Sequence, residues 1–187
     1  MNSFIVYTGP MFSAKTTSLL STLDRFKYQG KRIIAFKPML DDRYGTNEIS
    51  THGGWKVPAI CIKTGNDILE YLTGLNENPH VIAVDEAFMI PGVADVLVWL
   101  YRSGYSIVVS SLDLSSAGKP FEEIEKMLPW ATKVEKLSAV CVICNRDAYY
   151  THKKQVGGDE IEVGGHELYE PRCLQHSPAI NLNDNNL

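Results

Sequence analysis

The chain has 187 residues, of which 44% are hydrophobic and 21% charged, which is the composition of a globular protein with one core, or one core and a small accessory lobe. Its 18 basic and 22 acidic residues give a net charge of −4, which disfavours a general nucleic-acid binder because such proteins need a basic face. No apolar run is long enough to span a membrane, and MNSFIVYTGPMF lacks the basic start of a signal peptide, so we expect a cytoplasmic protein with no membrane partner.

The first elements predict an α/β fold. Residues 3–8 are apolar, β-branched and aromatic, which indicates a buried strand. A helix is expected from the end of GPMFSAKTT to about Gln29, where Gly30 stops it, and residues 32–36 form the next strand. Strand, helix and strand in this order are typical of a parallel α/β sheet. Residues 37–57 are expected to form a mobile loop.

The remaining pattern continues this alternation and then changes. Strands are predicted at 57–62, 80–87, 106–113 and 132–137, and helices at 66–74, 91–104 and 119–131. We therefore predict a mostly parallel sheet with flanking helices, like that of P-loop NTPases, over residues 1–138. Residues 139–178 are predicted to form a small β-rich metal-binding lobe, and the Asn-rich residues 179–187 a disordered tail.

A candidate phosphate-binding loop follows the first strand. The run nearly matches G-x-x-x-x-G-K-[ST], with alanine at the second glycine, and comprises Gly9, Pro10, Met11, Phe12, Ser13, Ala14, Lys15 and Thr16, with Thr17 beside it. Such a loop turns its amides toward phosphate, while the lysine meets the β/γ oxygens and the hydroxyl binds Mg²⁺. The alternative is a plain strand-to-helix turn with an exposed lysine.

Two acids end the strand at 80–87. Asp85 is suited to hold Mg²⁺, directly or through water, and Glu86 beside it is free to act as a base. Read alone, both could be ordinary acids at a strand end. Together with a phosphate loop at the same end of a parallel sheet, the catalytic interpretation is favoured.

The cysteine spacing predicts a metal site. Cys141-x2-Cys144 and Cys173-x2-His176 form two pairs, separated by the 28 residues 145–172. A Cys₃His set suits a closed, structural Zn²⁺ site, whereas disulfides are not expected without an export signal. The alternative is three unpaired thiols and a surface histidine. Cys61 lies alone in an apolar stretch and is interpreted as a core residue.

These motifs, taken together, resemble the type II thymidine kinases, the family of the cytosolic, bacterial and phage enzymes. The segments that carry the resemblance run in the family's order over residues 3–176: GPMFSAKTT, DDRY (41–44), STH (50–52), VDEA (84–87), SSLD (110–113), KPF (119–121), AVCVIC (139–144), VGG (163–165), Tyr169 and CLQH. The resemblance implies an ATP-dependent kinase that phosphorylates the 5′-hydroxyl of thymidine to give dTMP.

The resemblance also implies roles on the phosphate side. Lys15 would bind the β/γ-phosphates, Thr16 and Asp85 would hold Mg²⁺, and Arg43 would steady the phosphates. Glu86 would be the general base that takes the proton from the thymidine 5′-hydroxyl. Because phosphoryl transfer requires mainly positioning and charge stabilisation, these residue types suit the reaction.

On the nucleoside side, the resemblance implies a thymine pocket and a covering loop called the lasso. The residues concerned are Met11, Met89, Leu112 and Phe121 for the pocket and Val163, Gly164, Gly165 and Tyr169 for the lasso. The zinc lobe would hold both roots of this loop. The family is usually tetrameric and is inhibited by its end product dTTP, so a homotetramer and feedback by dTTP are implied here.

Some positions depart from the family pattern. Ala14 replaces the usual glycine, and Phe88, Met89 and Ser116 differ from the usual residues around the base. These departures concern base selectivity more than phosphoryl transfer. They leave two alternatives, which are a kinase of the same fold with another deoxynucleoside preference and a catalytically weak sensor that binds dTTP. A zinc-ribbon module for nucleic acid is the least favoured, since only His152-Lys153-Lys154 offers a basic cluster.

Overall fold

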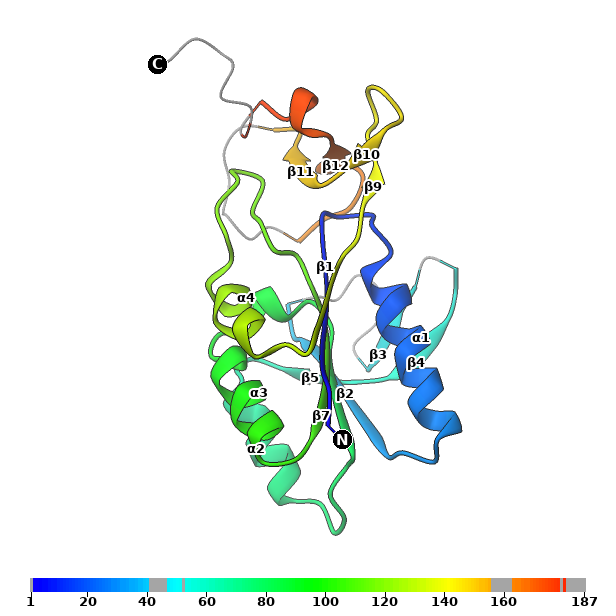
Figure 1. Ribbon diagram of the computed structural model, residues 1–187, viewed down its shortest axis with the longest axis vertical. Coiled ribbons are helices and arrows are strands. Elements are labelled where there is room, and N and C mark those ends of the chain that lie inside the picture. Colours follow the sequence, from blue (N-terminus) through cyan, green and yellow to red (C-terminus); the bar gives the residue numbers. More distant parts are fainter. Residues whose placement is uncertain (1, 41–46, 52, 156–162, 179, 181–187) are drawn as a thin grey trace.

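A computed structural model of the protein describes residues 2–40, 47–51, 53–155, 163–178 and 180. A six-stranded sheet forms the centre of the molecule, in the spatial order β5-β2-β6-β7-β1-β8, and every pair in it is parallel (Figure 1). The strands are β1 (Phe4–Thr8), β2 (Ile33–Pro38), β5 (Ile60–Ile62), β6 (Val81–Val84), β7 (Ser106–Ser111) and β8 (Lys133–Lys136). The predicted α/β class is confirmed.

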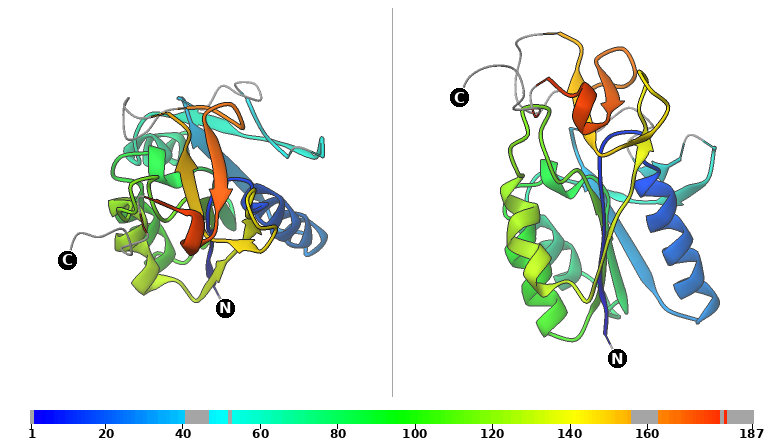
Figure 2. Two further views of the ribbon diagram at one scale, coloured as in Figure 1. Left: turned by 90° about the horizontal axis from the view of Figure 1, so that it is seen from above. Right: turned by 45° about the horizontal axis from the view of Figure 1, so that its top comes forward.

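Helices cover both faces of this sheet. On one face lies α1 (Lys15–Tyr28), and on the other lie α2 (Asn66–Thr73), α3 (Val93–Arg102) and α4 (Glu122–Met127) (Figures 1 and 2). Alternate strand residues supply the two cores because successive side chains point to opposite faces. Val84 and Val109 belong to the core under α3 and α4, whereas Ala83 and Val108 pack with Leu20 of α1.

The segment predicted as a mobile loop contains a hairpin. Within residues 37–57 the chain forms β3 (Glu48–Ser50), which pairs antiparallel with β4 (Lys56–Pro58). The prediction of one strand over 57–62 was therefore wrong in part: β4 ends at Pro58, which has no N–H to continue a ladder, and the chain then joins β2 as β5.

The helix predicted over 119–131 is shorter than expected. Phe121 is still extended, with φ −83° and ψ 125°, so α4 begins at Glu122. It ends at Met127, and the turn η2 (Leu128–Trp130) that follows is a 3₁₀ helix containing Pro129, whose missing N–H cannot continue an α-helix.

Beyond β8 the chain builds a small lobe above the carboxyl edge of the sheet (Figure 2). Strand β9 (Ala139–Val140) pairs with β10 (Asp147–Ala148), and β11 (Tyr150–Lys153) pairs with β12 (Tyr169–Arg172), both antiparallel. The 3₁₀ turn η3 (Leu174–His176) follows. Apart from Ile180, the predicted disordered tail 179–187 lies outside the described residues, and the boundary near residue 138 stays a prediction.

Within the parts of the chain that the structure describes, no helix combines the length and the apolar character that crossing a membrane requires.

Candidate active site and metal centre

The candidate phosphate loop joins β1 to α1 at the carboxyl edge of the sheet. Phe12 and Ala14 have left-handed backbones, with φ of 65° and 60°. Alternation of left-handed with ordinary residues turns successive N–H groups toward one point and makes an anion-binding concavity. Gly9, with φ 134°, is required for a different reason: a Cβ there would lie 2.3 Å from the carbonyl oxygen of Leu137.

Four polar side chains of this region converge near the start of α1. Lys15 is buried and its Nζ donates to the Pro10 carbonyl at 2.6 Å, an oxygen that also accepts from Ser13 Oγ at 2.8 Å. Thr16 Oγ1 lies 3.2 and 3.3 Å from the two carboxylate oxygens of Asp85, which directly follows β6. A hydroxyl and a carboxylate in contact are the hard oxygen donors that Mg²⁺ prefers, so this pair fits a magnesium ion.

A cavity opens over these groups. It is lined by Met11, Phe12, Ser13, Ala14, Lys15, Thr16, Thr17, Lys37, Ile49, Ser50, Thr51, Asp85 and Glu86. Most of the predicted phosphate-binding residues therefore line one cavity. Gly9 and Pro10 are buried and do not line the cavity, and Arg43 lies outside the described residues.

A second, more apolar cavity adjoins the first and shares Met11 and Glu86 with it. Its lining comprises Met11, Glu86, Phe88, Met89, Leu112, Leu114, Ser115, Ser116, Phe121, Thr151, Val163, Gly164 and Tyr169. The structure thus brings together all but one of the predicted nucleoside-binding residues. Gly165 does not line this cavity; its carbonyl accepts from the amides of Leu168 and Tyr169 at 3.1 and 3.0 Å, which holds the turn before β12.

Glu86 stands at the junction of the two cavities. It follows Asp85 directly and begins the 3₁₀ turn η1 (Ala87–Met89) with a left-handed backbone, φ 50° and ψ 45°. A left-handed conformation is uncommon outside glycine, and it is often found at functional sites. Because of this sharp turn, the side chains of two consecutive acids lie in different parts of the site. Asp85 contacts Thr16, and Glu86 lies at the boundary with the apolar cavity.

The sequence analysis missed several lining residues. Phe88 was noted only as a departure, yet its ring lies 4.6 Å from that of Phe121 and supplies an aromatic wall beside Met89. Thr151 of β11 and Lys37, a buried lysine at the end of β2, were not singled out. The position of Lys37 at a strand end was a usable signal, whereas nothing local marks Thr151.

Two contacts tie the phosphate loop to the lobe. The Met11 amide donates to Thr151 Oγ1 at 3.0 Å, and the Phe12 ring stacks on His166, with centroids 3.7 Å apart and planes 10° apart. Both partners flank the segment that carries Val163 and Gly164. The two candidate binding regions are therefore in direct contact.

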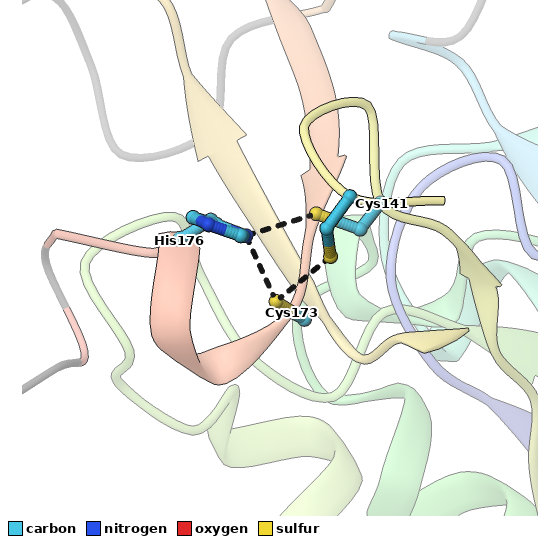
Figure 3. A group of neighbouring side chains, drawn as sticks. Cys141, Cys173 and His176 are labelled. Atoms are coloured by element: carbon cyan, nitrogen blue, oxygen red, sulfur yellow. Dashed lines mark hydrogen bonds between the residues drawn. The ribbon is translucent and has the colours of Figure 1, made fainter. Parts of the chain in front are cut away.

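The predicted metal ligands meet in the lobe. Cys141, Cys144, Cys173 and His176 bring one donor atom each to within 4.8 Å of one another, and Figure 3 shows Cys141, Cys173 and His176 pointing toward one another. Donors about 2.3 Å (sulfur) and 2.0–2.1 Å (nitrogen) from one tetrahedral ion lie about 3.5–3.8 Å apart. The measured separations are 3.7 Å for Cys141 Sγ to His176 Nδ1, 3.7 Å for Cys144 Sγ to Cys173 Sγ, and 3.3 Å for Cys173 Sγ to His176 Nδ1.

Two of these distances lie within that range and the third is slightly shorter, so the group fits zinc. All three cysteines are free thiols rather than members of a disulfide, whose sulfurs would be bonded at about 2.05 Å. In two of the three thiols the surroundings favour the thiolate, whereas burial raises the pKa of Cys173. Burial opposes ionisation of Cys141, but the backbone amides of Cys173, Ile143 and Cys144 outweigh it and lower its pKa to about 5. The backbone amide and guanidinium of Arg146 lower the pKa of Cys144. Thiolate is the form that binds metal, so the group can hold zinc.

Comparison with known proteins now identifies the family. The family profile described as "Thymidine kinase" matches residues 2–177, nearly the whole chain. The chain belongs to the thymidine kinase family. It is 36% identical over 179 residues to a thymidine kinase of Pyrobaculum aerophilum, covering 92% of this chain and 96% of that protein.

Two solved structures show a distant likeness to this thymidine kinase family member. The ATPase DotB of Legionella pneumophila aligns with a TM-score of 0.45 and 11% identity over 78% of this chain and 43% of its own. The genome packaging NTPase B204 of Sulfolobus turreted icosahedral virus 2, solved with ATP-gammaS, aligns with a TM-score of 0.44 and 12% identity over 74% and 75%. The family match establishes that the chain is a kinase, and the resemblance stated from its motifs is confirmed.

Proposed function

We propose that this kinase transfers the γ-phosphate of ATP to the 5′-hydroxyl of thymidine, giving dTMP and ADP. The observation that carries the proposal is the pair of adjoining cavities that share Met11 and Glu86. One cavity has the loop and cations that a polyphosphate needs, and the other has the apolar and aromatic walls that a pyrimidine needs. The reacting atoms would meet at their junction.

On the phosphate side, ATP would displace internal contacts. The Lys15 ammonium now donates to a backbone carbonyl, and a β- or γ-phosphate oxygen is a stronger, charged acceptor for the same proton. Thr16 and Asp85 are the residues that would hold magnesium, and the ion, when bound, neutralises charge on the β- and γ-phosphates. We propose that Arg43 adds a further positive charge.

Glu86 is proposed as the general base. As O5′ of thymidine forms its bond to the γ-phosphorus, the bond from phosphorus to the β–γ bridging oxygen breaks and ADP departs. The 5′-hydroxyl proton passes to the Glu86 carboxylate. The left-handed backbone of Glu86 directs it to this junction while Asp85, one residue earlier, stays with Thr16.

On the nucleoside side, the thymine ring would lie among Phe88, Phe121 and Met89, with Tyr169 closing the cavity. Backbone groups around Val163 and Gly164 are proposed to bind the base, which offers one donor and two acceptors on its edge. Ser116 also lines this cavity. The Ser116 hydroxyl can form a hydrogen bond with a base whose polar edge differs from that of thymine. A kinase with a different deoxynucleoside preference is therefore the alternative.

Zinc is proposed to have a structural role. Four protein ligands leave no open position for substrate, so the ion would close the lobe from which Thr151 and Tyr169 reach the nucleoside cavity. From the family resemblance we also propose a cytoplasmic homotetramer that is inhibited by dTTP.

The proposal is tested by a γ-phosphate transfer assay. ³²P-labelled ATP and Mg²⁺ are supplied with thymidine, deoxyuridine, deoxycytidine or deoxyadenosine, and the labelled monophosphate is measured. Thymidine is expected to give the highest kcat/KM. Preference for another nucleoside would support the alternative, and binding of dTTP with no transfer to any of them would support the sensor.

The base assignment is tested by Glu86→Gln, which keeps the shape of the side chain but cannot accept the proton. We expect kcat to fall about 10²–10⁴-fold, as is typical when a general base is lost, with little change in the Kd of ATP or thymidine. Glu77→Gln is the matched control, because Glu77 is exposed and pairs with Arg32 at the opposite edge of the sheet. Wild-type turnover in Glu86→Gln would rule out the role.

A further inference from the structure

Strand β7 ends in two serines, and both are almost fully buried. Ser110 is 1% exposed and Ser111 is not exposed at all. A strand core normally uses apolar residues at such positions, and a buried hydroxyl needs a hydrogen-bond partner. Because Val84 of β6 pairs with Val109 of β7, the next residues along, Asp85 and Ser110, lie side by side at the carboxyl edge.

Ser110 and Thr16 hold the Asp85 carboxylate from two directions. Ser110 Oγ donates to Asp85 Oδ1, and Thr16 Oγ1 lies within hydrogen-bond distance of both carboxylate oxygens. An ionised carboxylate can only accept hydrogen bonds, so both hydroxyls are donors. Thr16 comes from α1 and Ser110 from the sheet, so the carboxylate is fixed to two separate elements.

We infer that Ser110 is a positioning residue for the metal-binding carboxylate of Asp85. Its bond to Oδ1 restricts the rotation of the carboxylate plane, so that the carboxylate would be held in one orientation for a magnesium ion or its bound water. Carboxylates that bind metals are commonly held by such hydrogen bonds, and losing the supporting group typically costs about 10–100-fold in metal affinity. The inference rests on the proposed function, in which Asp85 holds Mg²⁺.

Ser111 has a different task, although it is the same residue type one position later. Its Oγ accepts from the Phe88 amide at 3.1 Å and donates to the Leu112 carbonyl at 3.0 Å. The bond from the Phe88 amide steadies η1, which carries Phe88 and Met89 of the nucleoside cavity. Since consecutive side chains of a strand point to opposite faces, Ser110 serves the metal side and Ser111 the nucleoside side. Ser111 is therefore a matched control.

The test measures binding without turnover. Isothermal titration calorimetry gives the Kd of a non-hydrolysable ATP analogue once with Mg²⁺ and once with EDTA. The ratio of the Kd in EDTA to the Kd in Mg²⁺ reports how much the metal strengthens binding. We expect Ser110→Ala to reduce this ratio about tenfold, which corresponds to about 1.4 kcal/mol, while the Kd in EDTA stays at the wild-type value. Ser110→Thr, which restores the hydroxyl, should recover the ratio. Ser111→Ala should keep the wild-type ratio and weaken thymidine binding instead.

Two further variants separate the possible failures. Asp85→Asn should abolish the advantage of Mg²⁺; if it does not, the assignment of Asp85 in the proposed function is wrong. If Asp85→Asn loses the advantage but Ser110→Ala keeps it, the role of Ser110 is overturned and the proposed function stands. Ser110→Cys, which keeps the volume but donates weakly, replaces the alanine variant if circular dichroism shows that the latter is unfolded.

Discussion

At the scale of single residues, Ala14 shows how a phosphate loop tolerates an unusual side chain. Its φ is 60° and it caps α1 rather than lying within it, so the good helix propensity of alanine does not help. An L-residue in this conformation is strained by about 1–2 kcal/mol, which is small beside the charge-assisted contacts that the loop can make to a polyphosphate. We therefore expect the native protein to bind Mg-ATP.

Replacing this alanine by glycine should stabilise the protein. Ala14→Gly removes the left-handed strain, although it also makes the unfolded chain more flexible, so we expect the free energy of unfolding to rise by up to about 1 kcal/mol. Urea unfolding followed by circular dichroism measures this change, and calorimetry should show only a modest change in ATP affinity. A lower urea midpoint in Ala14→Gly would contradict the strain. ATP binding that appears only in the glycine variant would favour the sensor instead.

At the scale of elements, the contact of the phosphate loop with the lobe links the two binding regions. The Phe12 ring is held against His166, three residues before Tyr169 of the nucleoside cavity. Stacked aromatic pairs contribute about 0.5–1.5 kcal/mol beyond their buried area. Because the loop and the lobe segment share this contact, disturbing it should affect nucleoside binding through the position of the chain around Val163 and Gly164.

We expect His166→Ala to weaken thymidine binding about 2–10-fold, measured by calorimetry with the full chain. The Kd of ATP in the absence of thymidine should change less, since Lys15 and Thr16 are untouched. His166→Phe preserves a stacked ring and should retain most of the affinity. His80→Ala is the control, because His80 accepts a hydrogen bond from the Arg32 amide at the other edge of the sheet. Equal thymidine affinity in His166→Ala and wild type would contradict this coupling.

At the scale of the whole molecule, the lobe contributes to the nucleoside cavity while the sheet carries the phosphate site. Thr151 and Tyr169 belong to the paired strands β11 and β12, and Cys173 directly follows β12. Binding of a structural metal adds to folding free energy, so the order of these strands should depend on zinc. Nucleoside affinity should therefore be more sensitive to the metal than ATP affinity.

We expect mass spectrometry of the metal to find one zinc ion per chain in the wild-type protein. Cys144→Ser should lose this ion. This variant, or zinc removal by a chelator, should weaken thymidine binding more than ATP binding. Cys61→Ser is the matched control, since Cys61 lies on β5 outside the metal cluster. A gently purified wild-type protein without zinc, or an equal loss of both affinities, would contradict the prediction.

The sequence by itself determined the features that depend on neighbouring residues. Parallel α/β order follows from apolar runs alternating with helical stretches, and the metal cluster follows from the x2 spacing of Cys141 with Cys144 and of Cys173 with His176. The phosphate loop and the acids after β6 could be predicted because the carboxyl ends of parallel strands meet at one edge. In each case a short motif already contains the geometry that the site needs.

Only the tertiary structure decided which distant groups touch. Met11 and Thr151 are 140 residues apart in sequence, and Ser110 and Asp85 are 25 apart; no periodicity encodes either contact. The hairpin β3–β4 was missed because its strands have 3 residues each, too short for alternation to be read. The left-handed backbones of Ala14 and Glu86 likewise depend on the surrounding structure. An isolated L-residue disfavours this conformation, so the packed strands, loop and helix around these two residues must hold them in it.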